Sequence, residues 1–552
     1  QREATEGRFL SRFPYLRGCA SPRRGLSLSL SLPLCAFLLS FRLLFLSVPR
    51  CVVRQLSFGH EVFRLASNGS EGEGGFPRAR ALFVILSVRH ADGSGVIRVR
   101  SKFAGLRSGI HRLRAHDGRR HGRMLSAVDL PLGGSSSATV AGLYYTELWI
   151  GSPPKHYFVQ VDTGSDQLWV NCIQCRDCPK TSDLGLELTL YDPSGSSSGS
   201  LVACKDDFCS MLYRGRVSGC TPSALCQFYL QYGDGSTSRG YFVRDIMQYN
   251  QLTGNFKTSP ANASVVFGCS VHETGQLDAS SQAVDGIMGF GQSNTSVVSQ
   301  LASEGKVKKM FAHCLDGVNG GGIFTIGQVV EPHVKMTPLV ANQSHYNVYM
   351  KAIDVGGVML RLPSDVFDTG RGVEDRLGTI IDSGTTLTYI AEEAFNPLMK
   401  AILSYGPHVH YYALEGSSCF RYTGSVDDAF PYVTFYFENS VTLKVLPHEY
   451  LYQIGDFDWC IGFQNSGSQN RDSRGWTVLG DLVLANRLVV YDLENQAIGW
   501  TNYDCSSSIK IKDSRTGAMY SVGAHNISLA CKLDLPRFSL IIYLIILLHW
   551  IC

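Results

Sequence analysis

Two short stretches of this 552-residue sequence place an acidic residue at the end of an apolar run. The first is Val161-Asp162-Thr163-Gly164-Ser165, and the second is Ile381-Asp382-Ser383-Gly384-Thr385, 220 residues later. A carboxylate buried at the end of a strand is costly unless hydrogen bonds surround it. In both stretches the neighbouring hydroxyls can supply such bonds, and the glycine permits a close backbone approach. Taken alone, each triplet is also compatible with an ordinary β-turn.

The order of the motifs favours a pair of similar units over two unrelated turns. Each stretch is followed later in the chain by two apolar residues and a glycine, first as Ile287-Met288-Gly289 and then as Val478-Leu479-Gly480. We therefore expect two similar lobes that each contribute one carboxyl group to a shared cleft. Two adjacent carboxyl groups cannot both ionise cheaply, so they would share a proton and could act together as an acid and a base.

With these motifs the chain resembles the pepsin family of aspartic endopeptidases over about residues 143 to 505, and its cysteine-rich segment resembles the nepenthesin-type branch of plants. The resemblance implies an all-β, bilobal fold with short helices, in which a cleft separates two β-barrel-like lobes. It also implies that Asp162 and Asp382 form the catalytic dyad, the standard example of paired carboxyl groups with split pKa values. The ionised aspartate would activate a bridging water, and the protonated one would polarise the scissile carbonyl, without a cofactor or a metal.

The resemblance also assigns supporting roles around the dyad. Thr163 and Ser383 would lock the two loops together by mutual hydrogen bonds, although Ser383 stands where threonine is commoner. Ser165 and Thr385 would bond the carboxylates from outside, beside Gly164 and Gly384. The alternative is a set of coincidental turns in some other β protein.

A hairpin is predicted between the two motifs of the first half. Asp234-Gly235 lies between two strand-like runs, which is a strong hairpin signal. The alternative to a functional role is a plain surface hairpin. In pepsin-like enzymes, however, a hairpin at this place closes over the substrate, and the resemblance makes Tyr232, Gly233 and Asp234 substrate-binding flap residues. Trp169 then matches the residue whose indole N–H meets the flap tyrosine.

Cysteines are dense after the first motif and then sparse. Twelve lie between residues 172 and 505: Cys172, Cys175, Cys178, Cys204, Cys209, Cys220, Cys226, Cys269, Cys314, Cys419, Cys460 and Cys505. The Cys-x-x-Cys-x-x-Cys start could indicate zinc, but no second ligand pair follows at zinc spacing, so we expect disulfides and an oxidising compartment. The resemblance implies the pairs Cys172–Cys175, Cys178–Cys269, Cys204–Cys226, Cys209–Cys220, Cys314–Cys505 and Cys419–Cys460.

Charge is divided unevenly along the chain. Residues 1–127 hold 22 Lys and Arg against 7 Asp and Glu (net +15), whereas the remainder holds 28 against 40 (net −12). Because the positive charge lies outside the expected folded body, nucleic-acid binding is not expected. The partners we expect are protein or peptide substrates of a monomeric enzyme.

The N-terminal region is divided into a leader, residues 1–94, and a basic prosegment, residues 95–141. The apolar runs Leu26–Val48 and Ala81–Val88 could each be the core of a secretory signal, and the alternative is mistranslated upstream sequence, since no Met precedes Met124. In pepsin-like zymogens a basic prosegment covers the acidic cleft; the alternative here is a solvated basic run. Conversion is expected between Met124 and Leu143, in the stretch Gly133–Ser137, predicted to be flexible.

The remaining boundaries follow the motifs. We expect an N-terminal lobe over 142–340, a C-terminal lobe over 341–505 with a helix at Ala391–Ser404, a stalk over 506–530 and a hydrophobic tail over 531–552. Sequons for N-glycosylation begin at Asn262, Asn294, Asn342 and Asn526.

The apolar run Phe538–Cys552 has 15 residues, fewer than the roughly 20 of a spanning helix. A polar spacer and small residues precede it, which fits a signal for a glycosylphosphatidylinositol anchor with Ser528 as the attachment residue; a short membrane helix is the alternative. The expected function is an aspartic endopeptidase at the outer cell surface. The alternative is a protease-dead binding or inhibitor protein, although such plant proteins have damaged triplets and both triplets are intact here.

Overall fold

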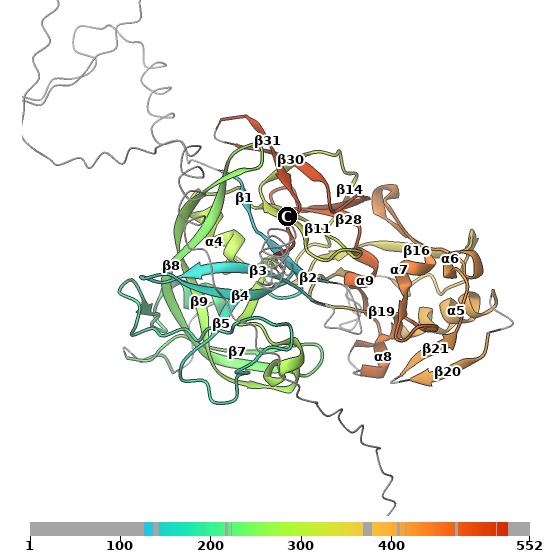
Figure 1. Ribbon diagram of the computed structural model, residues 1–552, viewed down its shortest axis with the longest axis horizontal. Coiled ribbons are helices and arrows are strands. Elements are labelled where there is room, and N and C mark those ends of the chain that lie inside the picture. Colours follow the sequence, from blue (N-terminus) through green and yellow to red (C-terminus); the bar gives the residue numbers. More distant parts are fainter. Residues whose placement is uncertain are drawn as a thin grey trace, which may run out of the picture. The chain divides into compact units, whose positions relative to one another are not determined.

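The computed structural model describes residues 126–135, 143–215, 219–221, 223–367, 378–405, 409–414, 416–469, 473–514 and 516–527. All of them belong to one compact unit, residues 103–552 (Figure 1). The expected leader (1–94), residues 95–125 of the expected prosegment, the tail 531–552 and Ser528 lie outside the described residues.

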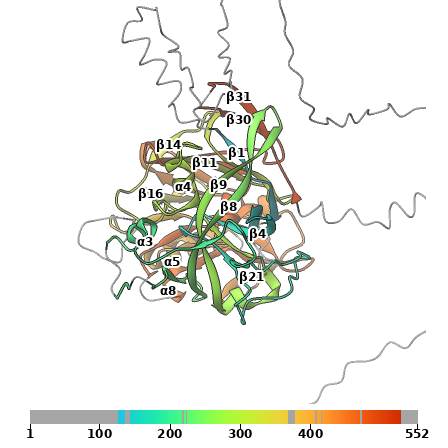
Figure 2. The ribbon, with the colours of Figure 1, turned by 90° about the vertical axis from the view of Figure 1, so that its left-hand side faces the viewer.

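One long sheet runs through the first lobe and into the junction with the second. Its strands, from one edge to the other, are β14 (Met336–Pro338), β29 (Ala497–Asn502), β28 (Arg487–Asp492), β11 (Met310–Leu315), β12 (Gly322–Ile326), β1 (Val128–Asp129), β8 (Thr237–Gly254), β9 (Lys257–Thr274), β5 (Leu168–Asn171), β10 (Gly286–Gly289), β4 (Lys155–Asp162), β3 (Leu143–Ile150) and β2 (Leu132–Ser135). The short strands β6 (Ser200–Leu201) and β7 (Gln227–Gln231) pair with β8. Figure 2 shows the long β8–β9 hairpin crossing the front of this lobe.

The second lobe consists of smaller sheets and most of the helices. Its sheets are β15 (Asn347–Val348), β18 (Thr379–Ile381), β27 (Thr477–Leu479), β19 (Thr388–Ile390) and β26 (Phe463–Asn465); β17 (Val358–Met359), β16 (Met350–Val355), β22 (Val433–Phe437) and β23 (Thr442–Val445); and β20 (Tyr411–Leu414), β21 (Ser417–Arg421), β25 (Asp458–Ile461) and β24 (Leu451–Gln453). The helices are α3 (Asp207–Leu212) and α4 (Val297–Ser303) in the first lobe, and α5 (Glu392–Leu403), α6 (Val426–Ala429), α7 (Pro447–Tyr450), α8 (Ser466–Gln469) and α9 (Asp481–Leu484) in the second. Short 3-10 turns are η1 (Gly275–Asp278), η2 (Ser280–Gln282) and η3 (Glu438–Ser440).

Alternating burial explains why the sequence forms these strands. Along β4, Tyr157, Val159 and Val161 point into the core and are almost completely buried. The same pattern in β28 places Leu488 and Val490 in one hydrophobic cluster and Val489 and Tyr491 in another, so that this strand packs on both faces. The expected all-β, two-lobed, pepsin-like fold is confirmed, and the expected helix at Ala391–Ser404 is found as α5.

The N-terminal described segment differs from the expectation of a flexible stretch. Gly133, Gly134 and Ser135 belong to β2 and pair with β3, and Gly134 O accepts a hydrogen bond from Gly321 N at 2.8 Å. A side chain at Gly133 would collide with the ring of Tyr145 at 2.7 Å. Residues 133–135 are therefore ordered by the sheet, and a conversion cut within them would break a paired strand.

The C-terminal segment also differs from expectation, because residues 506–527 do not form an extended stalk. β30 (Ser508–Lys512) pairs with β13 (Gln328–Glu331) and with β31 (Met519–Gly523). Ile509, Ile511 and Val522 are buried by this small sheet. The chain then returns to the first lobe, where His525 Nε2 lies 2.9 Å from Asp129 Oδ2 of β1.

Disulfide pairing is where the structure departs most from the sequence expectation. The twelve cysteines form Cys172–Cys269, Cys175–Cys178, Cys204–Cys220, Cys209–Cys226, Cys314–Cys505 and Cys419–Cys460. The last two pairs agree with the expectation, and the other four expected pairs are wrong. For Cys172 and Cys178 the reason is register: β5 runs parallel to β9 with Val170 opposite Cys269, so the chain leaving β5 brings Cys172, not Cys178, beside Cys269.

No helix among the described residues is long and apolar enough to cross a membrane. The expected tail at Phe538–Cys552 lies outside the described residues.

Candidate active site

The two aspartate loops occupy equivalent places in the two lobes. β4 ends at Asp162 and runs parallel to β10, with Asp162 opposite Gly289. β18 ends directly before Asp382 and runs parallel to β27, with Ile381 opposite Leu479. The backbone N–H of Asp382 donates to Leu479 O at 3.0 Å, and Phe290 N donates to Asp162 O at 2.7 Å. The apolar-Gly motifs noticed in the sequence are thus the strands that hold the two aspartates.

The two carboxyl groups, 220 residues apart in sequence, lie against each other. A Cβ built on Gly164 would stand 2.6 Å from Asp382 Oδ1, and one built on Gly384 would overlap Asp162 Oδ1. Each glycine therefore passes against the carboxyl group of the opposite loop, and no larger residue fits at either position. The side chains of Asp162 and Asp382 also share a hydrogen bond.

Each carboxyl group receives matching hydrogen bonds from its own loop. Gly164 N donates to Asp162 Oδ1 at 2.8 Å, and Gly384 N donates to Asp382 Oδ1 at 2.8 Å. The hydroxyl of Ser165 donates to Asp162 Oδ2, and that of Thr385 donates to Asp382 Oδ2 at 2.6 Å. The outer oxygen of each aspartate is thereby fixed, and the inner oxygens face each other.

Burial and mutual repulsion make Asp162 a weak acid. Asp162 is 5% exposed, and this burial, followed by the charge of Asp382, raises its pKa to about 7; the hydrogen bonds from Ser165 and Gly164 act in the opposite direction. Two carboxyl groups in contact exchange protons as a coupled pair. The raised pKa of Asp162 means that its carboxyl group is more readily protonated than that of a free aspartate.

Thr163 and Ser383 connect the loops behind the carboxyl groups. Ser383 N donates to Thr163 Oγ1 at 2.8 Å, and Ser383 Oγ is directed to Val161 O at 3.5 Å. Both side chains are buried. The two loops are thus tied directly to each other, from one lobe to the other.

The predicted flap hairpin lies between β7 and β8. Gly233, Asp234 and Gly235 form its exposed tip, and Asp234 accepts hydrogen bonds from the backbone and hydroxyl of Ser236. Tyr232 is half-buried, and its hydroxyl accepts a hydrogen bond of 2.7 Å from Trp169 Nε1. Its pKa is raised by burial and then by the charge of Asp162, which places the tyrosine within electrostatic reach of the dyad.

One acidic residue near the dyad was not singled out from the sequence. Asp481 follows the second apolar-Gly motif directly, is 0% exposed, and among the described residues neither of its carboxyl oxygens has a hydrogen-bond partner. Burial raises its pKa, and the charges of Asp382 and Asp162 raise it further. Burial and these two neighbouring charges therefore favour the neutral form of the Asp481 carboxyl group. The signal in the sequence that could have identified Asp481 was its position directly after Gly480.

The zinc alternative does not fit the cysteine-rich segment. Cys172, Cys175 and Cys178 are all engaged in disulfides. Within the part of the chain that the structure describes, no group of three His, Cys, Asp or Glu residues is placed to hold a metal ion.

A two-lobed, pepsin-like fold with paired aspartate loops is thus the class that the structure defines. Two family models, described as xylanase inhibitor N-terminal and xylanase inhibitor C-terminal, match residues 144–328 and 345–502. The chain is 48% identical over 451 residues to aspartic proteinase 36 of Arabidopsis thaliana, covering 82% of this chain and 92% of that protein. It therefore belongs to the plant family of pepsin-like aspartic proteinases.

More distant relatives agree with this placement. The chain is 27% identical over 382 residues to aspartic proteinase nepenthesin-2 of Nepenthes gracilis, covering 66% of this chain and 79% of that protein. The crystal structure of basic 7S globulin from soybean superimposes with a TM-score of 0.53 at 19% identity, covering 68% of this chain and 96% of that one. The similarity to the soybean globulin structure is evidence for the fold alone.

Proposed function

We propose that the protein is an aspartic endopeptidase that hydrolyses peptide bonds with a water molecule activated by Asp162 and Asp382. The observation that carries this proposal is the contact between the two carboxyl groups, each held by its own glycine N–H and hydroxyl. Names of close relatives, such as aspartic proteinase 36, support the same class of reaction.

In the proposed mechanism one carboxyl group keeps the shared proton and the other is ionised, so the two groups have different roles. The ionised aspartate accepts a proton from a water that lies between the carboxyl groups, and the water oxygen attacks the scissile carbonyl carbon. The protonated aspartate donates a hydrogen bond to the carbonyl oxygen as negative charge develops there. The proton taken from water is then passed to the leaving amine, so the dyad returns to its single-proton state and no covalent intermediate is formed.

The raised pKa of Asp162 sets the working range of this mechanism. A dyad with one proton is required, and the pKa of about 7 keeps that proton in place at acid pH. Activity is expected to fall as the pH rises through about 7, because the second carboxyl group then ionises.

Tyr232 and the flap tip are proposed to close over the bound peptide. The tip residues are exposed and held in shape by Asp234, while Tyr232 is anchored by Trp169. Such a closing hairpin excludes water and positions the substrate chain. The substrates are proteins or peptides that reach the cleft in an extended form.

The family-model description makes a catalytically silent binding protein the second candidate, since it refers to inhibitors. Both Asp-[Thr/Ser]-Gly triplets are intact here, and each glycine N–H donates to its own aspartate, which supports the protease. The six disulfides support passage through the secretory pathway. Tethering to the outer cell surface by a lipid at Ser528, with a short membrane helix as the alternative, stays part of the proposal.

The purified, processed protein should cleave an acid-denatured protein at about pH 4, and pepstatin should block the cleavage. Absence of cleavage by protein that is folded and free of its prosegment would contradict the protease proposal and favour the binding protein.

A further inference from the structure

His345 reaches from the second lobe to the first catalytic loop. Its Nδ1 lies 2.9 Å from the carbonyl oxygen of Gly164, the glycine that follows Asp162 by two residues. A backbone carbonyl can only accept a hydrogen bond, so Nδ1 must carry a proton and donate it. His345 is half-buried, and its main-chain oxygen accepts a hydrogen bond of 2.6 Å from Gln292 Nε2. Both the side chain and the backbone of His345 are therefore fixed against the first lobe.

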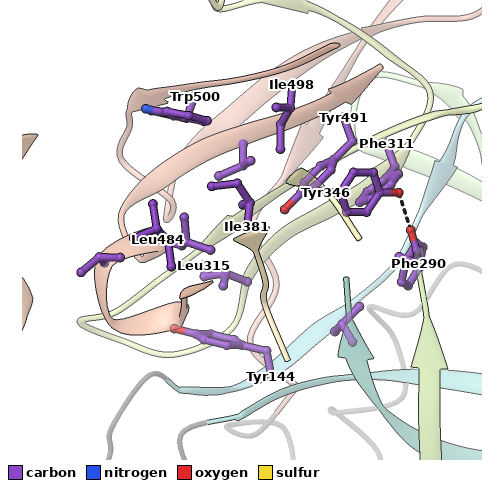
Figure 3. Close-up of a cluster of buried hydrophobic side chains, with 14 of the residues drawn as sticks. Tyr144, Phe290, Phe311, Leu315, Tyr346, Ile381, Leu484, Tyr491, Ile498 and Trp500 are labelled. Atoms are coloured by element: carbon purple, nitrogen blue, oxygen red, sulfur yellow. Dashed lines mark hydrogen bonds between the residues drawn. The ribbon is translucent and has the colours of Figure 1, made fainter. Parts of the chain in front are cut away.

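Tyr346, the next residue, bonds to residues that adjoin the two aspartates. Its hydroxyl donates to Phe290 O at 2.6 Å (Figure 3). Phe290 N in turn donates to Asp162 O at 2.7 Å. The carbonyl of Tyr346 accepts from Ile381 N at 3.1 Å, one residue before Asp382. Tyr346 is fully buried and packs on Tyr491 with ring centroids 4.6 Å apart.

These contacts connect the two aspartates by a route separate from Thr163 and Ser383. The backbone of Tyr346 is fixed to β18, which ends directly before Asp382, and β15, which starts at the following residue, pairs with the same strand. The imidazole of His345 is fixed to the loop that carries Asp162. A rigid dipeptide thus spans from one catalytic loop to the other.

We propose that His345 is a positioning residue that holds the first catalytic loop at its working distance from Asp382, through the hydrogen bond from Nδ1 to Gly164 O. The proposal rests on the proposed peptidase function. Its physical basis is that Gly164 touches the opposite carboxyl group while its N–H bonds Asp162, so a small shift of this peptide changes the geometry of the dyad.

Two substitutions separate the hydrogen bond from the rest of the side chain. His345→Leu keeps bulk but removes the donor, whereas His345→Asn places an amide N–H where Nδ1 stands. His345→Leu should lower kcat about ten-fold and leave KM within about two-fold, because positioning of the reacting groups is lost rather than substrate binding. His345→Asn should restore kcat to within about two-fold of wild type. Equal losses in both variants, or no loss in His345→Leu, would overturn the proposal.

A second measurement decides the matter without relying on activity. Hydrogen exchange of the backbone amides in residues 163–166 should be faster in His345→Leu than in wild type and unchanged in His345→Asn. Unchanged exchange in His345→Leu would contradict the proposal that His345 holds the first catalytic loop in place. If the wild-type enzyme does not cleave protein at all, the peptidase proposal fails, and the exchange result alone supports or refutes the role of His345.

Discussion

Tyr232 shows how a single hydroxyl can matter to the site without contributing to the core. Its ring packs beside the disulfide-rich cluster of the first lobe, and its hydroxyl is bound by Trp169. The residue therefore joins the hairpin to a buried indole. Removing the hydroxyl would free the flap while leaving the packing of the ring intact.

Tyr232→Phe is expected to lower kcat/KM several-fold, because one hydrogen bond worth about 1 kcal/mol fixes the closed flap. The free energy of unfolding should change by less than about 1 kcal/mol. Tyr229→Phe is the matched control, since Tyr229 lies on the same hairpin with 62% of its surface exposed. Wild-type kcat/KM in Tyr232→Phe would show that this contact has no part in closing the flap.

At this scale, the sequence was most informative where a residue's role depends on its neighbours in the chain. The surroundings of Asp162 and Asp382 were predictable because glycine and hydroxyl lie within three residues of each carboxyl group. Disulfide partners were not, since Cys172 meets Cys269 only through the parallel pairing of β5 and β9. The bridging contact of His345 with Gly164 spans 181 residues and leaves no local signal.

At the scale of the elements, β30 and β31 form a hairpin in the segment where a stalk was expected. The segment Ser508-Ile-Lys-Ile-Lys512 alternates polar and apolar residues, which is a strand signal that its serine and lysine content obscured. Its isoleucines pack on β13 and on Ala127, close to the first described strand. Because Cys314–Cys505 lies just before it, this hairpin is anchored covalently as well as by packing.

Ile511→Ala is expected to lower the free energy of unfolding by about 2 to 5 kcal/mol, as for other fully buried isoleucines. Met519→Ala on the neighbouring strand is the control, because Met519 is 55% exposed and should change stability by less than about 0.5 kcal/mol. Denaturant unfolding measures both. Equal and negligible effects would mean that residues 506–527 are a loose stalk after all.

For the whole molecule, several buried acids favour the folded state at low pH. Burial raises the pKa of Asp285 to about 7 despite two backbone hydrogen bonds, and burial, with a further contribution from Asp278, raises that of Glu273 to about 8. Asp162 belongs to the same group. His525, whose pKa is raised by its hydrogen bond to Asp129, acts in the same direction, whereas the buried neutral His313, with a pKa of about 3, opposes it.

The sign of the pH effect follows from these shifts. An acid whose pKa is higher in the folded than in the unfolded state contributes stability that is complete below about pH 4 and is lost as the pH rises towards 7 to 8. We therefore expect a higher Tm at pH 4.5 than at pH 8, with a smaller difference in Glu273→Gln. A Tm that rises between pH 4.5 and 8 would contradict the burial of these carboxyl groups.

The central claim is that Asp162 and Asp382 together hydrolyse peptide bonds, and single substitutions of the dyad test it most directly. The measurement is cleavage of an acid-denatured protein by purified Asp162→Asn and Asp382→Asn, with Asp285→Asn as a control buried acid outside the dyad. Both dyad variants are expected to fold as the wild type does, judged by circular dichroism, and to lose cleavage by a factor of at least about a thousand, since neither carboxyl group can act alone. Asp285→Asn should keep its activity at the temperature where it is folded. Cleavage close to the wild-type rate by either dyad variant would contradict the account.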